Sequence, residues 1–173
     1  GVTKMYTRKI TGDPVLVCWS DASWANRRDA KSTGGYVITM IHPETLEGTK
    51  GHHTIIGWSS NKLKRVARSS LAAEVQAMIN GEDELHLCRA VWAEMNGHKV
   101  NLEDPDETVR KGPGTVIIDA KSIYDTLASQ TQPLQLAEKR TALELLAYIQ
   151  NTELNETETR WCHGEANISD SLT

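Results

Sequence analysis

The stretch Val15-Leu-Val-Cys-Trp-Ser-Asp21-Ala-Ser decides the fold, because a compact apolar run leads directly into a carboxylate. The run follows Gly12-Asp-Pro14 and predicts a strand over 15–20. A carboxylate at the end of a buried strand is costly unless it is paired or bound to a cation. Taken alone, Asp21 is best interpreted as a turn or cap residue. Three further acidic residues change that interpretation.

Asp119 also ends an apolar run, Val116-Ile-Ile118, whereas Glu74 falls on a predicted helix and Asp170 falls near the end of the chain. Each has an ordinary alternative when taken singly. Glu74 could be a helix-face charge, and Asp119 and Asp170 could be helix caps. Together, two strand ends and two helical carboxylates could converge on a divalent cation, because hard cations prefer oxygen ligands.

The composition favours a single globular domain over 1–173, with a folded core over about 13–173. Hydrophobic residues make up 39% of the chain and charged residues 24%. Neither a stretch as apolar as a membrane span nor a secretory signal is visible. The net charge of −4 does not indicate nucleic-acid binding, although a local basic patch can still bind phosphate. The three cysteines fit neither a zinc site nor a disulfide framework, which favours a reducing intracellular compartment.

Hydrophobic periodicity predicts an α/β fold with a mixed five-stranded sheet, three antiparallel strands followed by two parallel ones, and helices on both faces. The strands are expected at 15–20, 35–41, 53–59, 115–118 and 157–162. A helix is expected to begin at Ser69 or Ser70 and to break near Gly81. Further helices are expected over 82–95, 119–127 and 134–150, with a shortened one over 167–173. Loops are expected over 43–51 and 101–114. Strands one and four can then lie side by side, which would bring Asp21 and Asp119 together.

Six sequence blocks, in order, resemble the ribonuclease H (RNase H) domain of copia-type LTR retrotransposon polyproteins. They are Trp19-Ser-Asp21-Ala-Ser-Trp24-Ala, Lys31-Ser-Thr-Gly-Gly-Tyr36-Val, Gly57-Trp-Ser-Ser60-Asn-Lys, Val66-Ala-Arg-Ser-Ser70-Leu-Ala-Ala-Glu74, Ile118-Asp119-Ala-Lys-Ser-Ile and Ile168-Ser-Asp170-Ser-Leu-Thr. The blocks cover most of the chain, and their order makes them specific where any one alone would be weak. The sequence departs from the family pattern at Leu71-Ala72, where a Thr-Glu pair is more usual, and at Ala120, where Asn is more usual.

The resemblance implies an RNase H-like fold and metal-dependent cleavage of the RNA strand of RNA–DNA hybrids, beside the reverse transcriptase of the same polyprotein. It implies two Mg²⁺ ions, for which Mn²⁺ can substitute. Asp21 would bridge the ions, Glu74 and Asp119 would hold the ion nearer the leaving group, and Asp170 would hold the ion nearer the attacking water. His163 would assist proton transfer or product release, and its alternative is a surface turn histidine. The implied location is cytoplasmic, in a virus-like particle, or nuclear.

Crowded carboxylates without metal repel one another, so at least one pKa should rise. Metal binding would relieve the repulsion and stabilise the fold.

Hydroxyl and basic side chains near the acids are candidates for substrate binding. Serines could contact the 2′-OH or phosphate of the substrate, although a single serine is more often a turn or cap residue. Basic runs are usually solvated surface, but here two runs flank the proposed metal site, which favours contact with backbone phosphates. Trp24 and Trp58 are expected in the core. The candidate contacts are Ser23, Ser32, Ser60, Ser122, Arg27, Arg28, Lys31, Lys62, Lys64, Arg65 and Arg68.

Two rival functions remain open from the sequence. One is an RNase H-like module that binds nucleic acid or the reverse transcriptase without catalysis. The other is a different enzyme on the same fold, such as a DNA strand-transferase or a proofreading exonuclease. The oligomeric state stays open, with a monomer expected for the isolated domain.

Overall fold

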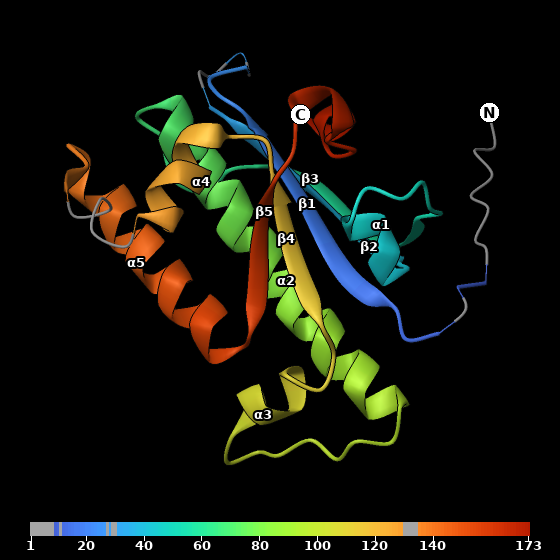
Figure 1. Cartoon of the computed structure of the whole chain (residues 1–173). Coiled ribbons are helices and arrows are strands. Elements are labelled where there is room, and N and C mark those ends of the chain that lie inside the picture. The colour runs from blue at the N-terminus through green and yellow to red at the C-terminus, as the bar shows by residue number, and fades with distance from the viewer. Residues whose placement is uncertain (1–8, 11, 27, 29–30, 130–134) are drawn as a thin grey trace.

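Five strands form one mixed sheet in the order β3-β2-β1-β4-β5 (Figure 1). The computed structural model describes residues 9–10, 12–26, 28, 31–129 and 135–173. The strand bounds are Val15–Ser23 (β1), Thr33–Ile41 (β2), Thr54–Lys62 (β3), Gly114–Ile118 (β4) and Thr157–Trp161 (β5). β1, β2 and β3 pair antiparallel, and β4 joins β1 and β5 in parallel. The predicted fold class is confirmed.

The central strand β1 is longer than predicted. Its antiparallel pairing with β2 continues to the Ser23–Thr33 pair, so Asp21 lies inside the strand opposite Gly35. The expectation that the strand ends at position 20 is wrong, because pairing with the neighbouring strand holds these polar residues extended. β1 also pairs with β4 on its other side, with Trp19 beside Ile117. This neighbouring parallel pair brings Asp21 and Asp119 to the same edge, as predicted.

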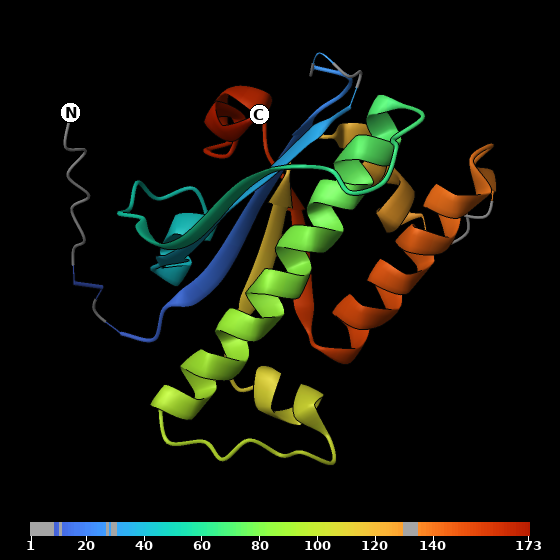
Figure 2. The same cartoon turned by 180° about the vertical axis from the view of Figure 1, so that it is seen from behind.

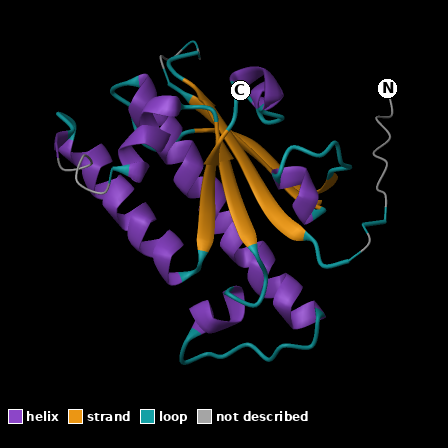
Figure 3. Cartoon of the chain, viewed as in Figure 1, coloured by secondary structure: helices purple, strands orange, loops and turns teal. Residues whose placement is uncertain are grey.

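Three long helices cover one face of the sheet (Figures 2 and 3). They are α2 (Ser70–Met95), α4 (Lys121–Ala128) and α5 (Lys139–Leu154). Short elements lie on the opposite face: helix α1 (Pro43–Leu46) and the 3₁₀ turns η2 (Gly164–Ala166) and η3 (Asp170–Leu172).

The alternation of side chains along the strands explains the two layers. On the α2 face, Leu16 and Cys18 pack with helix residues such as Met78 and Leu145. On the opposite face, Val17 and Trp19 belong to a smaller apolar cluster, to which the short elements add a few side chains. The core therefore lies mainly between the sheet and the three long helices.

Helix α2 does not break near Gly81, contrary to the prediction, but runs unbroken for 26 residues. At Gly81, α2 packs closely on β1, since a Cβ added there would lie 2.6 Å from Cys18 Sγ. The glycine therefore serves close packing rather than helix termination. The predicted N-cap is confirmed, because the Ser69 hydroxyl accepts a hydrogen bond from the Ala72 N–H. The helix ends at Met95 with Asn96 as its C-cap, and Gly97 follows with φ of 86°.

Other expected boundaries are corrected. The loops predicted over 43–51 and 101–114 contain α1 and the helix α3 (Pro105–Val109), each with a side-chain N-cap and a proline in its first turn. Helix α5 spans 139–154 rather than the predicted 134–150. The predicted first residue, Leu134, lies outside the described residues. The segment 167–173 forms the short turn η3 instead of an α-helix.

Two tryptophans expected in the core are exposed. Trp24 lies in the turn after β1 and is 51% exposed, and Trp58 lies on the edge strand β3 and is 59% exposed. The sequence pattern did not show that Trp58 would lie on a strand at the edge of the sheet, or that one face of the sheet would be sparsely covered by helices. Within the described part of the chain, no helix has both the length and the apolar character needed to span a membrane.

Candidate metal centre

Three of the predicted carboxylates meet at one edge of the sheet. Asp21 comes from β1, Glu74 from the N-terminal part of α2, and Asp119 from the position directly after β4. One carboxylate oxygen from each lies within 4.8 Å of the others. The residues are far apart in sequence, and it is the parallel pairing of β1 with β4 and the packing of α2 across them that bring them together.

Burial and mutual repulsion raise the pKa of the Glu74 carboxyl to about 8 from its usual 4.5. Burial is the largest cause, followed by repulsion from Asp21 and then from Asp119. A hydrogen bond from the Ala22 main-chain N–H acts in the opposite direction, because it stabilises the charged form. The predicted rise of a pKa within the cluster is confirmed. Such a cluster favours a bound cation, which would relieve the repulsion.

Asp21 is the most buried of the three, at 7% exposed. Burial raises its pKa, and repulsion from Asp119 and Asp170 acts in the same direction. The Thr173 hydroxyl donates a hydrogen bond to Asp21 Oδ2, which lowers the pKa. The Asn26 side-chain amide in turn donates to the Thr173 main-chain oxygen at 3.2 Å.

Asp119 does not cap α4, although a helix cap was the ordinary alternative to a metal-binding role for this residue. The N-cap of α4 is Ala120, and no side chain makes a capping hydrogen bond there. The main-chain oxygen of Asp119 accepts a hydrogen bond from Trp161 Nε1 at 2.9 Å. The carboxylate is thus left facing Asp21 and Glu74 rather than the helix terminus.

Asp170 lies beside the three-carboxylate group rather than within it. Asp170 is exposed at the start of η3. Among the described residues, the group of acids whose oxygens all lie within 4.8 Å of one another consists of Asp21, Glu74 and Asp119, without Asp170. Its charge still raises the pKa of Asp21, so the two carboxylates are near each other. The segment is anchored by Asn167, whose side-chain amide donates to the Ser20 main-chain oxygen at 3.0 Å.

His163 is exposed in the turn that follows β5. The turn passes next to the cluster, since a Cβ on Gly164 would lie 3.6 Å from Asp119 Oδ2. The imidazole packs against the Trp161 ring with centroids 6.4 Å apart. Its predicted place beside the acidic residues therefore agrees with the structure, while its chemical role stays a prediction.

The predicted substrate contacts divide into two groups. Two serines bond within the protein: Ser60 donates to the Leu172 main-chain oxygen at 2.5 Å, and Ser32 accepts from the Ala25 N–H at 3.1 Å. Arg65 likewise pairs with Glu144. Ser23 is half-buried at the end of β1, and Arg27 lies outside the described residues. The remaining candidates are exposed: Arg28, Lys31, Lys62, Lys64, Arg68 and Ser122.

Sequence reasoning missed three groups that contact the acids: the Ala22 N–H, the Thr173 hydroxyl and the Trp161 indole. A main-chain N–H and a threonine hydroxyl belong to no sequence motif that would identify them as contacts of the acidic residues. Trp161 carried at most a weak signal as an aromatic residue near the end of the predicted fifth strand, whose pairing with β4 only the structure shows.

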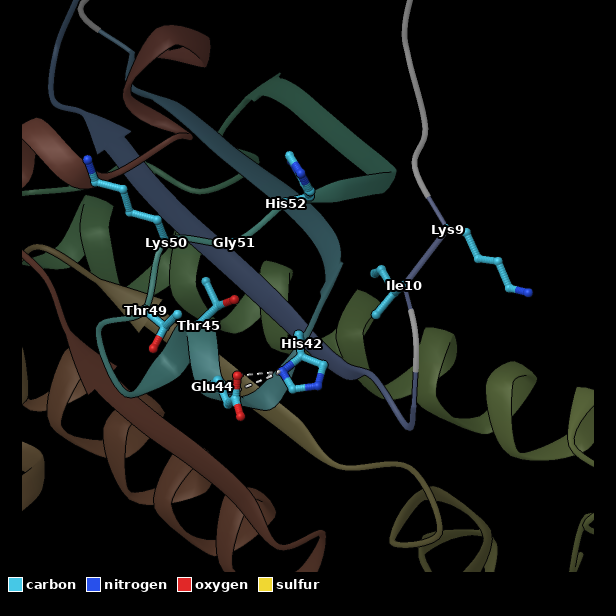
Figure 4. A pocket seen from close by; sticks show the side chains of 9 residues that line it. All are labelled: Lys9, Ile10, His42, Glu44, Thr45, Thr49, Lys50, Gly51 and His52. Carbon is cyan, nitrogen blue, oxygen red and sulfur yellow. Dashed lines mark hydrogen bonds and ion pairs between the residues drawn. The ribbon is translucent and has the colours of Figure 1, made fainter.

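A separate polar hollow lies on the sparsely covered face, but the side chains that line it do not point toward a common centre (Figure 4). It is lined in part by Lys9, His42, Glu44, Lys50 and His52. His42 Nδ1 lies 3.7 Å from Glu44 Oε2, whereas the Lys9 and Lys50 amines and the His52 ring point in different directions. The acidic cluster is therefore the better candidate site.

The sheet order, the helix layers and the strand-end carboxylates define an RNase H-like fold. The chain matches LC11-RNase H1, isolated from compost, with a TM-score of 0.56 and 14% identity over 91% of each chain. It matches the same protein in complex with an RNA/DNA hybrid with a TM-score of 0.54. The N-terminal RNase H domain of a Mycobacterium tuberculosis protein gives 0.51 and 17% identity, over 93% of this chain and 91% of that one.

Curated relatives are polyproteins of plant transposons. The chain is 36% identical over 110 residues to the retrovirus-related Pol polyprotein from transposon RE1 of Arabidopsis thaliana, and 31% identical over 110 residues to that from transposon RE2. Each match covers 63% of this chain but only 6% and 7% of the respective relative. No protein-family model matches the sequence. The resemblance to an RNase H domain of a retrotransposon polyprotein is confirmed by these relatives together with the fold.

Proposed function

We propose that this domain is a metal-dependent endoribonuclease that cleaves the RNA strand of RNA–DNA hybrids by two-metal-ion phosphodiester hydrolysis. The observation that carries the proposal is the meeting of Asp21, Glu74 and Asp119 within 4.8 Å at the edge formed by β1 and β4. An inert structural cluster would be expected to include paired cations. Here burial, followed by repulsion from Asp21 and Asp119, instead raises the pKa of Glu74 to about 8.

The chemistry of this donor set fits a hard divalent cation. Carboxylate oxygens are the ligands that Mg²⁺ prefers, and Mn²⁺ accepts the same donors. Asp21, Glu74 and Asp119 would hold the metal, with Asp170 completing the set from η3. Bound divalent ions supply an activated water and stabilise the departing sugar oxygen.

The chain's own residues prepare this site before any ligand binds. The Ala22 N–H holds the Glu74 carboxylate, and the Thr173 hydroxyl holds one oxygen of Asp21. His163, exposed in the turn whose Gly164 lies against Asp119, would carry a proton to or from the reacting groups. Preorganised side chains of this kind avoid reorganisation during the reaction.

The basic residues support nucleic-acid binding because they gather at the acidic end of the sheet. The Ser23–Thr33 and Thr33–Lys62 pairs place the end of β1, the start of β2 and the end of β3 together. Arg28 and Lys31 lie in the β1–β2 connection, and Arg68 precedes α2. These side chains would contact backbone phosphates, while Ser23 and Ser122 would meet sugar or phosphate oxygens.

The proposed macromolecular partners follow from the relatives. One similar structure, LC11-RNase H1, was solved with an RNA/DNA hybrid, and the Arabidopsis relatives are Pol polyproteins. We infer that this domain acts on a hybrid beside the reverse transcriptase of its own polyprotein.

The test compares four substrates of the same sequence: an RNA–DNA hybrid, duplex DNA, duplex RNA and single-stranded RNA, each with one labelled strand. The protein is assayed with Mg²⁺, with Mn²⁺ and with a chelator. Internal cleavage of the hybrid's RNA strand alone, abolished by the chelator, is expected. Tight hybrid binding without cleavage in either metal would instead support a binding module, and cleavage of duplex DNA would support a different enzyme class.

A further inference from the structure

Trp161 ends β5 beside Asp119, and its indole is bonded to that residue. Trp161 Nε1 donates to the Asp119 main-chain oxygen at 2.9 Å. The ring is 41% exposed, so burial alone does not explain why the side chain takes this position.

The hydrogen bond lies directly after the pairing of β4 with β5 ends. The ladder between these strands ends at the Ile118–Trp161 pair, and the Cys162 N–H then donates to the Ile118 oxygen at 2.9 Å. The Trp161 indole donates to the main-chain oxygen of the next residue, Asp119. A side chain of β5 therefore holds the main chain of Asp119 between β4 and α4.

The same ring contacts two other groups near the acidic cluster. Lys121 Nζ lies 5.7 Å from the centroid of the Trp161 ring, within the range of a cation–π contact. The His163 imidazole meets the ring edge-on, with centroids 6.4 Å apart. One indole therefore contacts the Asp119 main chain, a cation two residues further along and the histidine of the adjacent turn.

We propose that Trp161 is a positioning residue, which fixes the Asp119 carboxylate against Asp21 and Glu74 and orients His163 beside them. The inference deepens the proposed function and rests on it for the role in catalysis. Its structural part, the placing of Asp119, holds independently of activity. Groups that orient metal-binding carboxylates typically affect metal affinity about 10- to 100-fold when they are removed.

The test uses Trp161→Phe, which keeps an aromatic ring but removes the N–H donor. Trp58→Phe is the matched control, because Trp58 lies on the distant edge strand β3 and is 59% exposed. Isothermal calorimetry with Mn²⁺ alone should show at least a roughly tenfold loss of affinity in W161F and none in W58F. In the hybrid assay, kcat should fall about 10- to 100-fold in W161F while KM stays within about twofold.

A second variant guards against misfolding of W161F. Incorporation of 3-benzothienylalanine at position 161 replaces the N–H by sulfur in a ring of nearly the same shape, and should reproduce the loss of metal affinity. Crystal structures of the metal-free wild-type and W161F proteins should show the Asp119 carboxylate displaced in the variant.

The outcomes separate this inference from the proposed function. A wild-type protein that binds Mn²⁺ without cutting hybrid would contradict the proposed function, yet calorimetry and the two crystal structures would still decide the role of Trp161. An unmoved Asp119 with wild-type metal affinity in the sulfur-containing variant would overturn the inference. So would a rise in KM alone, since that pattern would mark Trp161 as a substrate contact.

Discussion

Gly81 in α2 packs directly on Cys18 in β1, so closely that a Cβ at position 81 would lie 2.6 Å from the Cys18 sulfur. This contact lies near the middle of a single helix of 26 residues that packs on β1, β2 and β4. The N-terminal part of the helix delivers Glu74 to the acidic cluster, while its C-terminal half carries a buried arginine to the opposite end of the strands. The close approach of helix and strand therefore links the site to the packing of the core.

Gly81→Ala should destabilise the protein by about 1–3 kcal/mol, because an overpacked contact outweighs the gain of about 1 kcal/mol in helix propensity. Urea denaturation of the metal-free protein measures the change. The double variant G81A/C18A should lose less stability than the sum of the single variants, since the smaller side chain on β1 relieves the clash. A stabilised G81A protein would show that the helix tolerates the extra methyl group.

Asp21→Asn, Glu74→Gln and Asp119→Asn should each lower the rate of hybrid cleavage by orders of magnitude, corresponding to roughly several kcal/mol of transition-state stabilisation. Asp170→Asn should have a smaller effect than these three, because Asp170 is exposed beside the group rather than part of it. Single-turnover kinetics in Mg²⁺ provides the measurement. Glu103→Gln, in the exposed loop before α3, is the control and should retain the wild-type rate. Wild-type rates in D21N or D119N would contradict the assignment of the site.

The raised pKa of Glu74 makes the stability of the metal-free protein depend on pH. The folded state holds the Glu74 proton up to about pH 8, whereas the unfolded state releases it near 4.5. The folded protein thus binds more protons over this range, and its stability from this group falls as the pH rises through it. Glu74→Gln removes the loss, so E74Q should be more stable than wild type at pH 8.5, by on the order of 2 kcal/mol, and the difference should vanish toward pH 4.5.

Urea denaturation at several pH values in the presence of a chelator checks this result. Mg²⁺ should restore much of the wild-type stability at pH 8.5 and help E74Q less, because the variant lacks one metal ligand. A difference between the two proteins that does not change with pH would refute the electrostatic explanation.

Arg89→Met should destabilise the fold by about 3–5 kcal/mol, because it leaves three buried hydrogen-bond acceptors without their donor. The guanidinium is 1% exposed and donates to the Gly112 oxygen at 2.5 Å, to Thr157 Oγ1 at 2.6 Å and to the Asn155 oxygen at 2.7 Å. These bonds tie α2 to the segment before β4 and to the start of β5. Thermal and urea denaturation measure the loss. Arg140→Met is the control, since the Arg140 side chain is 74% exposed and its loss should change stability by only about 0.5 kcal/mol.

His163→Ala should slow hybrid cleavage by about tenfold or more while leaving stability unchanged, because the imidazole is exposed and is proposed to move a proton rather than support the fold. The pH dependence of kcat, compared between H163A and wild type, tests that role. A variant with the wild-type rate and pH profile would return His163 to the ordinary role of a surface turn residue.

The sequence by itself determined the mixed five-stranded sheet, with three antiparallel strands followed by two parallel ones, and the acidic residues that gather at its edge. Apolar runs such as 15–20 and 115–118 are local patterns, and a site was indicated because an Asp follows each of these two runs while further acidic residues occur elsewhere in the chain. The adjacency of β1 and β4 was expected as one possible arrangement, because parallel strands reached through helices by right-handed crossovers leave few alternatives. Boundaries were less accurate, as at Asp21, where pairing with β2 extends the strand.

Only the tertiary structure decided the features that depend on contacts between distant segments. Gly81 looked like a helix break, but its role is set by Cys18, and the buried hydrogen bonds of Arg89 join residues on other elements. The exposure of Trp58, the separate position of Asp170 and the bond from Trp161 to Asp119 likewise depend on three-dimensional packing. Local patterns fix which residues form each element, because they act through neighbouring positions along the chain. The pKa of Glu74 and the support around Asp119 arise only when desolvation and charge act across elements brought together by folding.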